Sequence, residues 1–508
     1  MSVEKNPFNE KIFEFDKELD LAFDEKNHEQ MITIINQMKS EIENFNNISK
    51  SKIYYSLGTA YGNLPLLDEQ FQNEETIEKQ LFYFRESINL IELINLEEIN
   101  NPYILGFKLN LYTNYANCLE NIGRKILAIE YYNKALNINP NFMMAVGNLG
   151  IAYYHYANID YNEEHQHCFN HFAYALLKKA INIEDPINEQ FKTCMNQYLN
   201  TYTEMYKNDF LEKELKVKDT EIYETDEKKY KEWALKENLF LNTINDLPIE
   251  YYKFANDDIH ISFIISDNQM NKINSIFGLY NQIKQEYIYS RYLYYESLYC
   301  NEEICYADKD TKLIDTLDYC IYSIRSEKMK TAYRILYSLL DKVAFFINYY
   351  FDLGIEERDV NFKSIWYSRK GGRNGYDYRN VLNKNDNFAM KAIYWIHKDF
   401  YYRVYESPNP KAKKISEIRN HLEHKYLKIT DDLLNTESCL NDELAYYICE
   451  TEFNNLTFEL LKLIREVIIN LSIAVDINEK KKKKLLENGN EVELMKINMY
   501  EYNDEFKI

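Results

Sequence analysis

The chain has 508 residues, 46% of them hydrophobic, and we expect about two to four domains with sizeable cores. Only 12 glycines and 8 prolines are present, and this scarcity of turn formers favours a mostly all-α fold. The net charge of −21 disfavours nucleic acid over most of the surface. No run reaches the ~18 apolar residues that span a bilayer, and the acidic N-terminus is unlike a signal peptide, so we expect a cytoplasmic chain. The eight scattered cysteines form no CxxC pair, which argues against a disulfide framework and a zinc ribbon.

Residues 112–140 place small and aromatic residues where two closely crossing helices need them, and Pro140 ends the second helix. The matching positions are Tyr112, Tyr115, Ala116, Leu119, Ala128, Tyr132 and Ala135. The pattern resembles the tetratricopeptide repeat (TPR) of about 34 residues. Degenerate copies surround it, one starting near Tyr54 and one near Leu149, each with an insertion between its two helices. We therefore predict a TPR-like α-solenoid over residues 1–205, with a concave surface for a protein or peptide partner.

The insertion of the later copy carries a cluster of ligand-type side chains. The cluster consists of His165, His167, Cys168 and His171. On a helix, His167 and His171 are four residues apart and could share a metal ion. No second ligand pair at a fixed spacing supports such a site, and the alternative is a set of polar insertion residues. We assign no metal.

Residues 206–325 are predicted to form a mainly helical connecting region to which the sequence assigns no function. Residues 231–248 indicate a helix that runs into a loop, and residues 259–265 are the best strand candidate of the chain.

Residues 326–476 have the helical pattern of an up-and-down four-helix bundle, and residues 477–508 form a charged tail with a run of lysines, Lys480–Lys484. A basic loop, SRKGGRNG, follows the first helix. The four helices are expected at 328–353, 387–405, 411–428 and 441–475.

Positive charge is concentrated in the bundle. Residues 363–428 hold 15 Lys and Arg against 6 Asp and Glu, a local charge of +9 in a chain that carries −30 elsewhere. A polyanion would be drawn to this stretch, although a solvated basic face is the simpler alternative. The candidate RNA contacts are Arg369, Lys370, Arg373, Lys411, Lys413, Lys414 and Lys425.

Within this stretch, Arg419 and Asn420 are followed by His424, an Arg-Asn-x-x-x-His string. RNA carries its own nucleophile, the 2′-hydroxyl, and His exchanges protons near neutral pH. Arg supplies a fixed, bidentate positive charge for the phosphorane oxygens. Asn420 shares a helix face with His424 and could orient the imidazole or contact phosphate. The expected products are a 2′,3′-cyclic phosphate and a 5′-hydroxyl, formed with no metal and no cofactor.

The spacing also constrains the number of chains in the site. His424 lies five positions after Arg419, so on an ideal helix the two side chains point about 140° apart. One helix alone would serve a single phosphate poorly, and two copies around a twofold axis could combine their groups in one cleft. We therefore expect a homodimer with a composite site.

Three stretches of the bundle, 337–351, 387–400 and 415–426, resemble the HEPN superfamily, and more closely its LA2681-like branch. Upstream stretches extend the resemblance to about 230–475. The resemblance implies a metal-independent endoribonuclease, often dimeric, that acts in bacterial defence against phage or in toxin systems. It carries the catalytic pattern onto Arg419, Asn420 and His424. His421 and Glu423 fill variable positions, and His421 could compete as the base.

The leading hypothesis is thus an endoribonuclease whose TPR half senses or restrains. The alternative is a non-catalytic TPR scaffold whose HEPN bundle binds RNA, a nucleotide or a partner protein. Transfer of a nucleotide group is a third option, but the chain has no nucleotidyltransferase signature.

Overall fold

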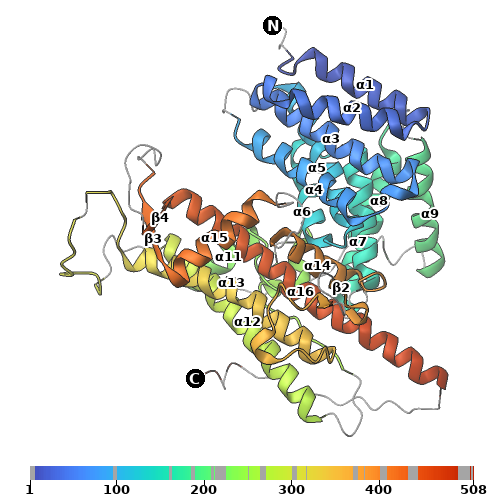
Figure 1. Ribbon diagram of the computed structural model, residues 1–508. Helices are drawn as coiled ribbons and strands as arrows, with labels where there is room; N and C mark the ends of the chain where they lie inside the picture. Colours follow the sequence, from blue (N-terminus) through green and yellow to red (C-terminus); the bar gives the residue numbers. More distant parts are fainter. Residues whose placement is uncertain are drawn as a thin grey trace.

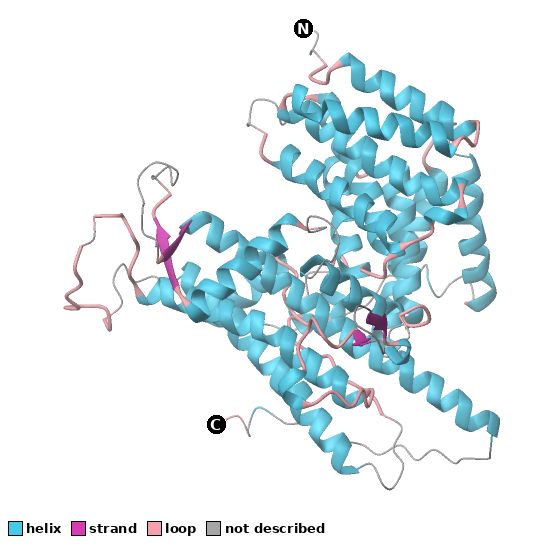
Figure 2. Cartoon of the chain, in the orientation of Figure 1, coloured by secondary structure: helices cyan, strands magenta, loops and turns pink. Residues whose placement is uncertain are grey.

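The structure is a computed structural model, and it is almost wholly helical (Figures 1 and 2). It describes residues 6–94, 100–159, 163–184, 189–206, 211, 225–249, 251–263, 270–299, 306–315, 317–369, 376–382, 384–400, 409–432, 444–489, 504 and 507. Its short 3₁₀ turns are η1 (Ile42–Asn44), η2 (Glu69–Phe71), η3 (Thr243–Asp246), η4 (Tyr252–Phe254), η6 (Glu357–Asp359) and η7 (Asn380–Leu382).

The N-terminal part is a stack of helix pairs, on the right of Figure 1, and confirms the predicted TPR-like solenoid. Each helix packs on the next. Its helices are α1 (Glu10–Asp24), α2 (His28–Glu41), α3 (Asn47–Leu67), α4 (Glu74–Glu92), α5 (Pro102–Asn121), α6 (Lys125–Ile138), α7 (Met143–Ile159), α8 (Glu163–Asn182) and α9 (Glu189–Met205). Asparagine side chains cap the N-termini of several of them, because they satisfy N–H groups that lack intrahelical partners. Gly58 shows why small residues recur, since an added Cβ would lie 2.7 Å from the Phe84 ring.

The sequence suggested that the cluster of His165, His167, Cys168 and His171 lies in an insertion between two helices, but the structure places it within a helix. All four of its residues are on α8, which begins at Glu163. His165 is buried, with its Nδ1 3.0 Å from Thr243 Oγ1, and Cys168 is also buried. Within the described parts of the chain, no three His, Cys, Asp or Glu side chains gather in a way that could hold a metal ion.

The connecting region contains α11 (Asp226–Lys236) and the long α12 (Met270–Tyr299). The expected strand is wrong for residues 259–263, which form no strand, and residues 264–265 lie outside the described residues. Ile259 and Ile261 are buried among helices that offer no partner strand. The carbonyl of Ile259 instead accepts a hydrogen bond from Lys284 Nζ, 2.7 Å away.

The first two helices of the bundle agree closely with the expected helices at 328–353 and 387–405, of which residues 401–405 lie outside the described residues. The other two differ at their ends from the expected helices at 411–428 and 441–475. The bundle helices are α13 (Ile324–Tyr350), α14 (Phe388–Phe400), α15 (Pro410–His424) and α16 (Glu450–Gly489). α12 packs along α13 and also contacts α16. The lysine run 480–484 lies on α16, which continues past the expected end at 475.

The described residues also include four short strands that we did not predict. β1 (Tyr367–Arg369) and β2 (Tyr376–Tyr378) pair antiparallel on either side of the basic loop. β3 (Tyr426–Thr430) pairs in parallel with β4 (Ala445–Cys449), directly after α15 and directly before α16. The expected helix at 411–428 therefore ends early, because Tyr, Ile and Thr after Lys425 favour a strand over a helix.

A buried ionic network joins the solenoid to the bundle. Asp399 at the end of α14 accepts hydrogen bonds from Arg85 of α4 at 2.7 and 3.0 Å and from Arg124 at 2.9 Å. Arg124 also contacts Glu466 of α16 at 2.5 Å. One hydrophobic core extends from α4 of the solenoid through the connecting region and the bundle, and a second cluster of buried residues lies between α1, α2 and α3. Gly123, with a φ of +86°, fits so closely that an added Cβ would lie 2.3 Å from the Phe388 carbonyl oxygen.

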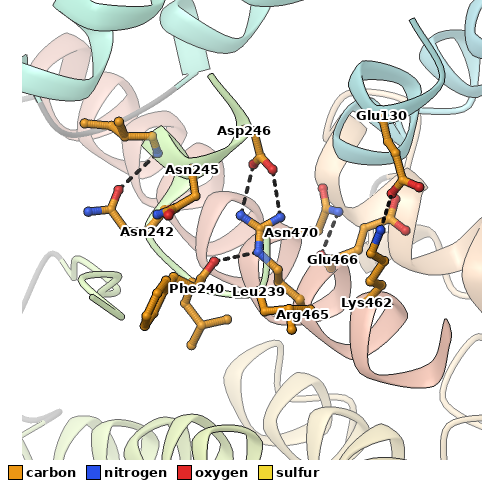
Figure 3. A network of polar contacts seen from close by, with 12 residues as sticks. Glu130, Leu239, Phe240, Asn242, Asn245, Asp246, Lys462, Arg465, Glu466 and Asn470 are labelled. Atoms are coloured by element: carbon orange, nitrogen blue, oxygen red, sulfur yellow. Dashed lines mark hydrogen bonds and ion pairs between the residues drawn. The ribbon is translucent and has the colours of Figure 1, made fainter. Parts of the chain in front are cut away.

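A second buried ion pair joins the connecting region to α16. Arg465 of α16 donates to both carboxylate oxygens of Asp246 at 2.8 and 3.2 Å and to the carbonyl of Phe240 at 2.6 Å (Figure 3). Burial raises the pKa of Asp246 above its usual range even though Arg465 opposes the shift. Lys462, one helical turn earlier, contacts Glu130 of α6 at 3.3 Å.

Candidate functional site

Helix α15 carries all three residues of the Arg-Asn-x-x-x-His string. Asn409 caps its N-terminus by accepting from Lys411 N and Ala412 N, and Pro410 occupies the first turn, where a missing N–H costs nothing. One face of the helix is buried in the core. Its residues are Ala412, Ile415, Ile418 and Leu422, spaced three and four apart as the helical period requires.

Side chains of α13 hold this helix along its length. Tyr333 donates to the carbonyl of Ile415 at 2.7 Å, and Tyr337 contacts Ser416 Oγ at 3.4 Å. Arg334 donates to the carbonyl of Leu422 at 3.0 Å, close to the C-terminal end of α15. This end, with β3 and β4, points away from the solenoid in Figure 1.

Arg419 is half-buried against α13. Its guanidinium carbon lies 5.5 Å from the centroid of the Tyr337 ring, and its Nη1 makes a long contact of 3.3 Å with Asn420 Oδ1. Among the described residues, no carboxylate forms an ion pair with Arg419. The guanidinium is thus oriented by an aromatic face and retains donors for an anion.

His424 and His421 have different surroundings. His424 is exposed, is the last residue of α15 and makes no hydrogen bond to any residue that the structure describes. His421 Nδ1 donates to the Glu417 carbonyl at 2.8 Å, and its ring lies 4.7 Å from that of Tyr446. Burial, with the charges of Glu417 and Glu452, raises the pKa of Tyr446. His424 is therefore the better placed of the two to exchange protons with a ligand.

The predicted RNA-contacting lysines are not equivalent. Lys411 pairs with Glu459 at 2.5 Å, and Lys414 pairs with Glu452. Lys413 and Lys425 are exposed. Arg369 ends β1 with its side chain outside the described part, and Lys370 and Arg373 lie outside the described residues. Acids from distant segments also pair with other cations of the basic stretch. These pairs are Lys384–Glu74, Lys398–Glu78 and Lys428–Asp318.

We expect the lysines of α15 that pair with acids to contribute less to RNA affinity than the exposed Lys413. Lys413→Gln should weaken binding of single-stranded RNA and lower its salt dependence, because it removes an exposed charge that no described carboxylate pairs with. Lys411→Gln is the matched control, because Glu459 already neutralises Lys411 and RNA must compete for it. Titrations at several salt concentrations check this ranking, and an equal loss for both variants would contradict it.

Residues 267–478 match the LA2681-like HEPN family, and residues 109–142 match the tetratricopeptide repeat. The chain carries an LA2681-like HEPN domain and a TPR. The HEPN match includes α12, upstream of the predicted bundle start at 326, and covers Arg419, Asn420 and His424. No curated protein and no solved structure matches the chain. No described helix is long and apolar enough to cross a membrane.

Sequence reasoning did not single out the α13 residues that shape the site of the HEPN domain. Tyr337 and Arg334 lie in the amphipathic helix predicted at 328–353, but helical periodicity does not show which neighbour each face meets. Arg419 and His424 are not joined by any contact between described residues, in keeping with the expected divergence of their side chains along α15.

Proposed function

We propose that the protein is a metal-independent HEPN endoribonuclease that cleaves RNA by attack of the 2′-hydroxyl. The observation that supports this is the exposed C-terminal end of α15, where His424 and Asn420 are accessible and Arg419 has no acidic partner among the described residues. His424 exchanges the proton, Arg419 stabilises the phosphorane, and Asn420 orients either group. The products are a 2′,3′-cyclic phosphate and a 5′-hydroxyl.

The proposal includes a homodimer formed through the HEPN domain. Arg419 packs toward α13 whereas His424 is exposed at the helix end, so a single copy offers the two groups in different directions. A twofold axis near the end of α15 lets Arg419 of one copy and His424 of the other meet on one phosphate. We place this activity in the bacterial cytoplasm, in anti-phage defence or as a toxin.

Regulation by the TPR solenoid is supported by a continuous path of contacts. Arg85 of α4 binds Asp399, and the next residue, Phe400, lies edge-to-face with Tyr337, with ring centroids 6.0 Å apart. Tyr337 in turn holds Arg419. A partner that shifts α4 thereby moves the ring on which the guanidinium rests.

The test of this regulation is Arg85→Gln, which removes the Arg85 charge from Asp399 and keeps the contact with Arg124. If the solenoid restrains the site, the full-length variant should cleave RNA faster than the parent by several fold. Cleavage rates with unchanged circular dichroism would report this effect. An unchanged cleavage rate would contradict regulation through this path of contacts.

The activity itself is tested by incubating the full-length protein with total RNA in EDTA and sequencing the new 5′-hydroxyl ends. Cleavage that persists in EDTA supports a metal-independent reaction. Intact RNA, with measurable RNA binding, would favour the alternative of a non-catalytic TPR scaffold.

A further inference from the structure

Arg334 differs from the buried arginines of this chain. Arg85, Arg124, Arg291 and Arg465 each bind a carboxylate. Arg334 is half-buried, and its Nη2 donates to the carbonyl of Leu422. Its Nε is buried with no hydrogen-bond partner among the described residues, and no described carboxylate pairs with it. A partly desolvated charge without a counter-charge is unfavourable, which suggests that a ligand supplies the negative charge.

The position of Arg334 links it to the candidate site. It precedes Tyr337 by one turn of α13, and Tyr337 holds Arg419. Leu422, which accepts from Arg334, follows Arg419 by three residues and so lies on the same side of α15. Two guanidinium groups without acidic partners among the described residues therefore lie along one face of the α13–α15 pair, near the end that carries His424.

We propose that Arg334 is a second phosphate-binding cation of this site, and that it contacts the RNA backbone beside the phosphate held by Arg419. The inference rests on the proposed function for the class of its ligand. The Leu422 carbonyl fixes one N–H of Arg334 and orients the planar group, and the remaining donors bind a phosphate oxygen. A cation that only capped the negative end of α15 would make the same carbonyl contact, so the two roles must be separated by experiment.

The experiment measures binding of a short, fluorescein-labelled single-stranded RNA to the full-length protein at several salt concentrations, with His424→Ala present in every sample to prevent cleavage. Arg334→Gln should weaken binding about tenfold and lower the salt slope by about 0.7, the loss of one phosphate contact. Arg334→Lys should keep the slope but bind less tightly than the parent, because a point charge cannot bind bidentately. Arg325→Gln is the control on the same helix, because Arg325 is exposed and already 3.5 Å from Glu450.

Each outcome decides the role of Arg334. A lowered melting temperature with an unchanged salt slope would show that Arg334 only caps α15 and would overturn the proposal, as would a parent that binds no RNA. If Arg334→Gln does not fold, Arg334→Lys decides by its affinity. RNA cleavage assays without the His424→Ala change then separate the two proposals. If Arg334→Gln lowers the salt slope but the wild-type protein does not cleave RNA, the phosphate site is supported and the nuclease is rejected. If the wild-type protein cleaves RNA but Arg334→Gln keeps the parental salt slope, the nuclease is supported and the phosphate site is rejected.

Discussion

His424→Ala is expected to slow RNA cleavage by about 10²–10⁴-fold, because it removes the group that exchanges the proton of the 2′-hydroxyl or of the leaving oxygen. Arg419→Ala should slow it by a similar or slightly smaller factor, through loss of charge stabilisation on the phosphorane. His424 is exposed, Arg419 is half-buried, and neither side chain makes an ion pair with a described residue, so folding should be preserved. Single-turnover cleavage in EDTA measures the rates.

The matched control is His421→Ala, the same substitution one turn earlier. His421 donates to a backbone carbonyl and packs on Tyr446, so its loss should cost helix stability and little of the chemical step. If His421→Ala abolishes cleavage while His424→Ala cleaves at the parental rate, the assignment of the base is wrong. A mixture of the Arg419→Ala and His424→Ala proteins adds a test of the dimer, since a composite site restores part of the activity.

Asp399→Ala is expected to destabilise the whole protein by about 3–5 kcal/mol, because it leaves buried positive charge without its counter-charge. Arg85 would lose its ion pair with Asp399, and Arg124 would lose Asp399 and keep Glu466. The measurement is the free energy of unfolding from urea titrations, with the m-value monitored for a change in cooperativity.

Asp359→Ala is the control for this change. Asp359 is exposed on η6 with a distant contact of 3.9 Å to Arg358, so its loss should stay within about 0.5 kcal/mol. Equal effects of the two substitutions would show that the network around Asp399 contributes little to holding the solenoid on the bundle.

Much of the fold follows from local patterns in the sequence. The TPR spacing around Tyr115, Ala128 and Pro140 predicted the helix pair α5–α6, and three- and four-residue steps predicted α13. The pattern failed where tertiary pairing decided the outcome. The helix expected at 411–428 ends at His424, and residues 426–430 form β3, because β4 and the segment at Cys320 offer backbone partners to a run that already favours a strand.

The candidate site shows the same division. Arg419, Asn420 and His424 could be chosen from the sequence because their chemistry is local and their spacing is short. The ion pairs of Lys411 and Lys414 could not be predicted from the sequence, because their acidic partners come from α16, some forty residues away along the chain. Arg334 was missed for the same reason, since its importance depends on the packing of α13 against the end of α15.

The ionic network around Asp399 makes the solenoid and the HEPN bundle poor candidates for separate expression or exchange. An isolated HEPN bundle would expose Asp399 and Glu466, and an isolated solenoid would expose Arg85 and Arg124, each on a surface shaped for the other half. Fragments made for a toxicity assay would therefore tend to aggregate, and their inactivity would say nothing about the intact chain. A foreign sensor grafted in place of this solenoid would need to reproduce those two arginines, so replacement of one half must proceed together with changes in the other.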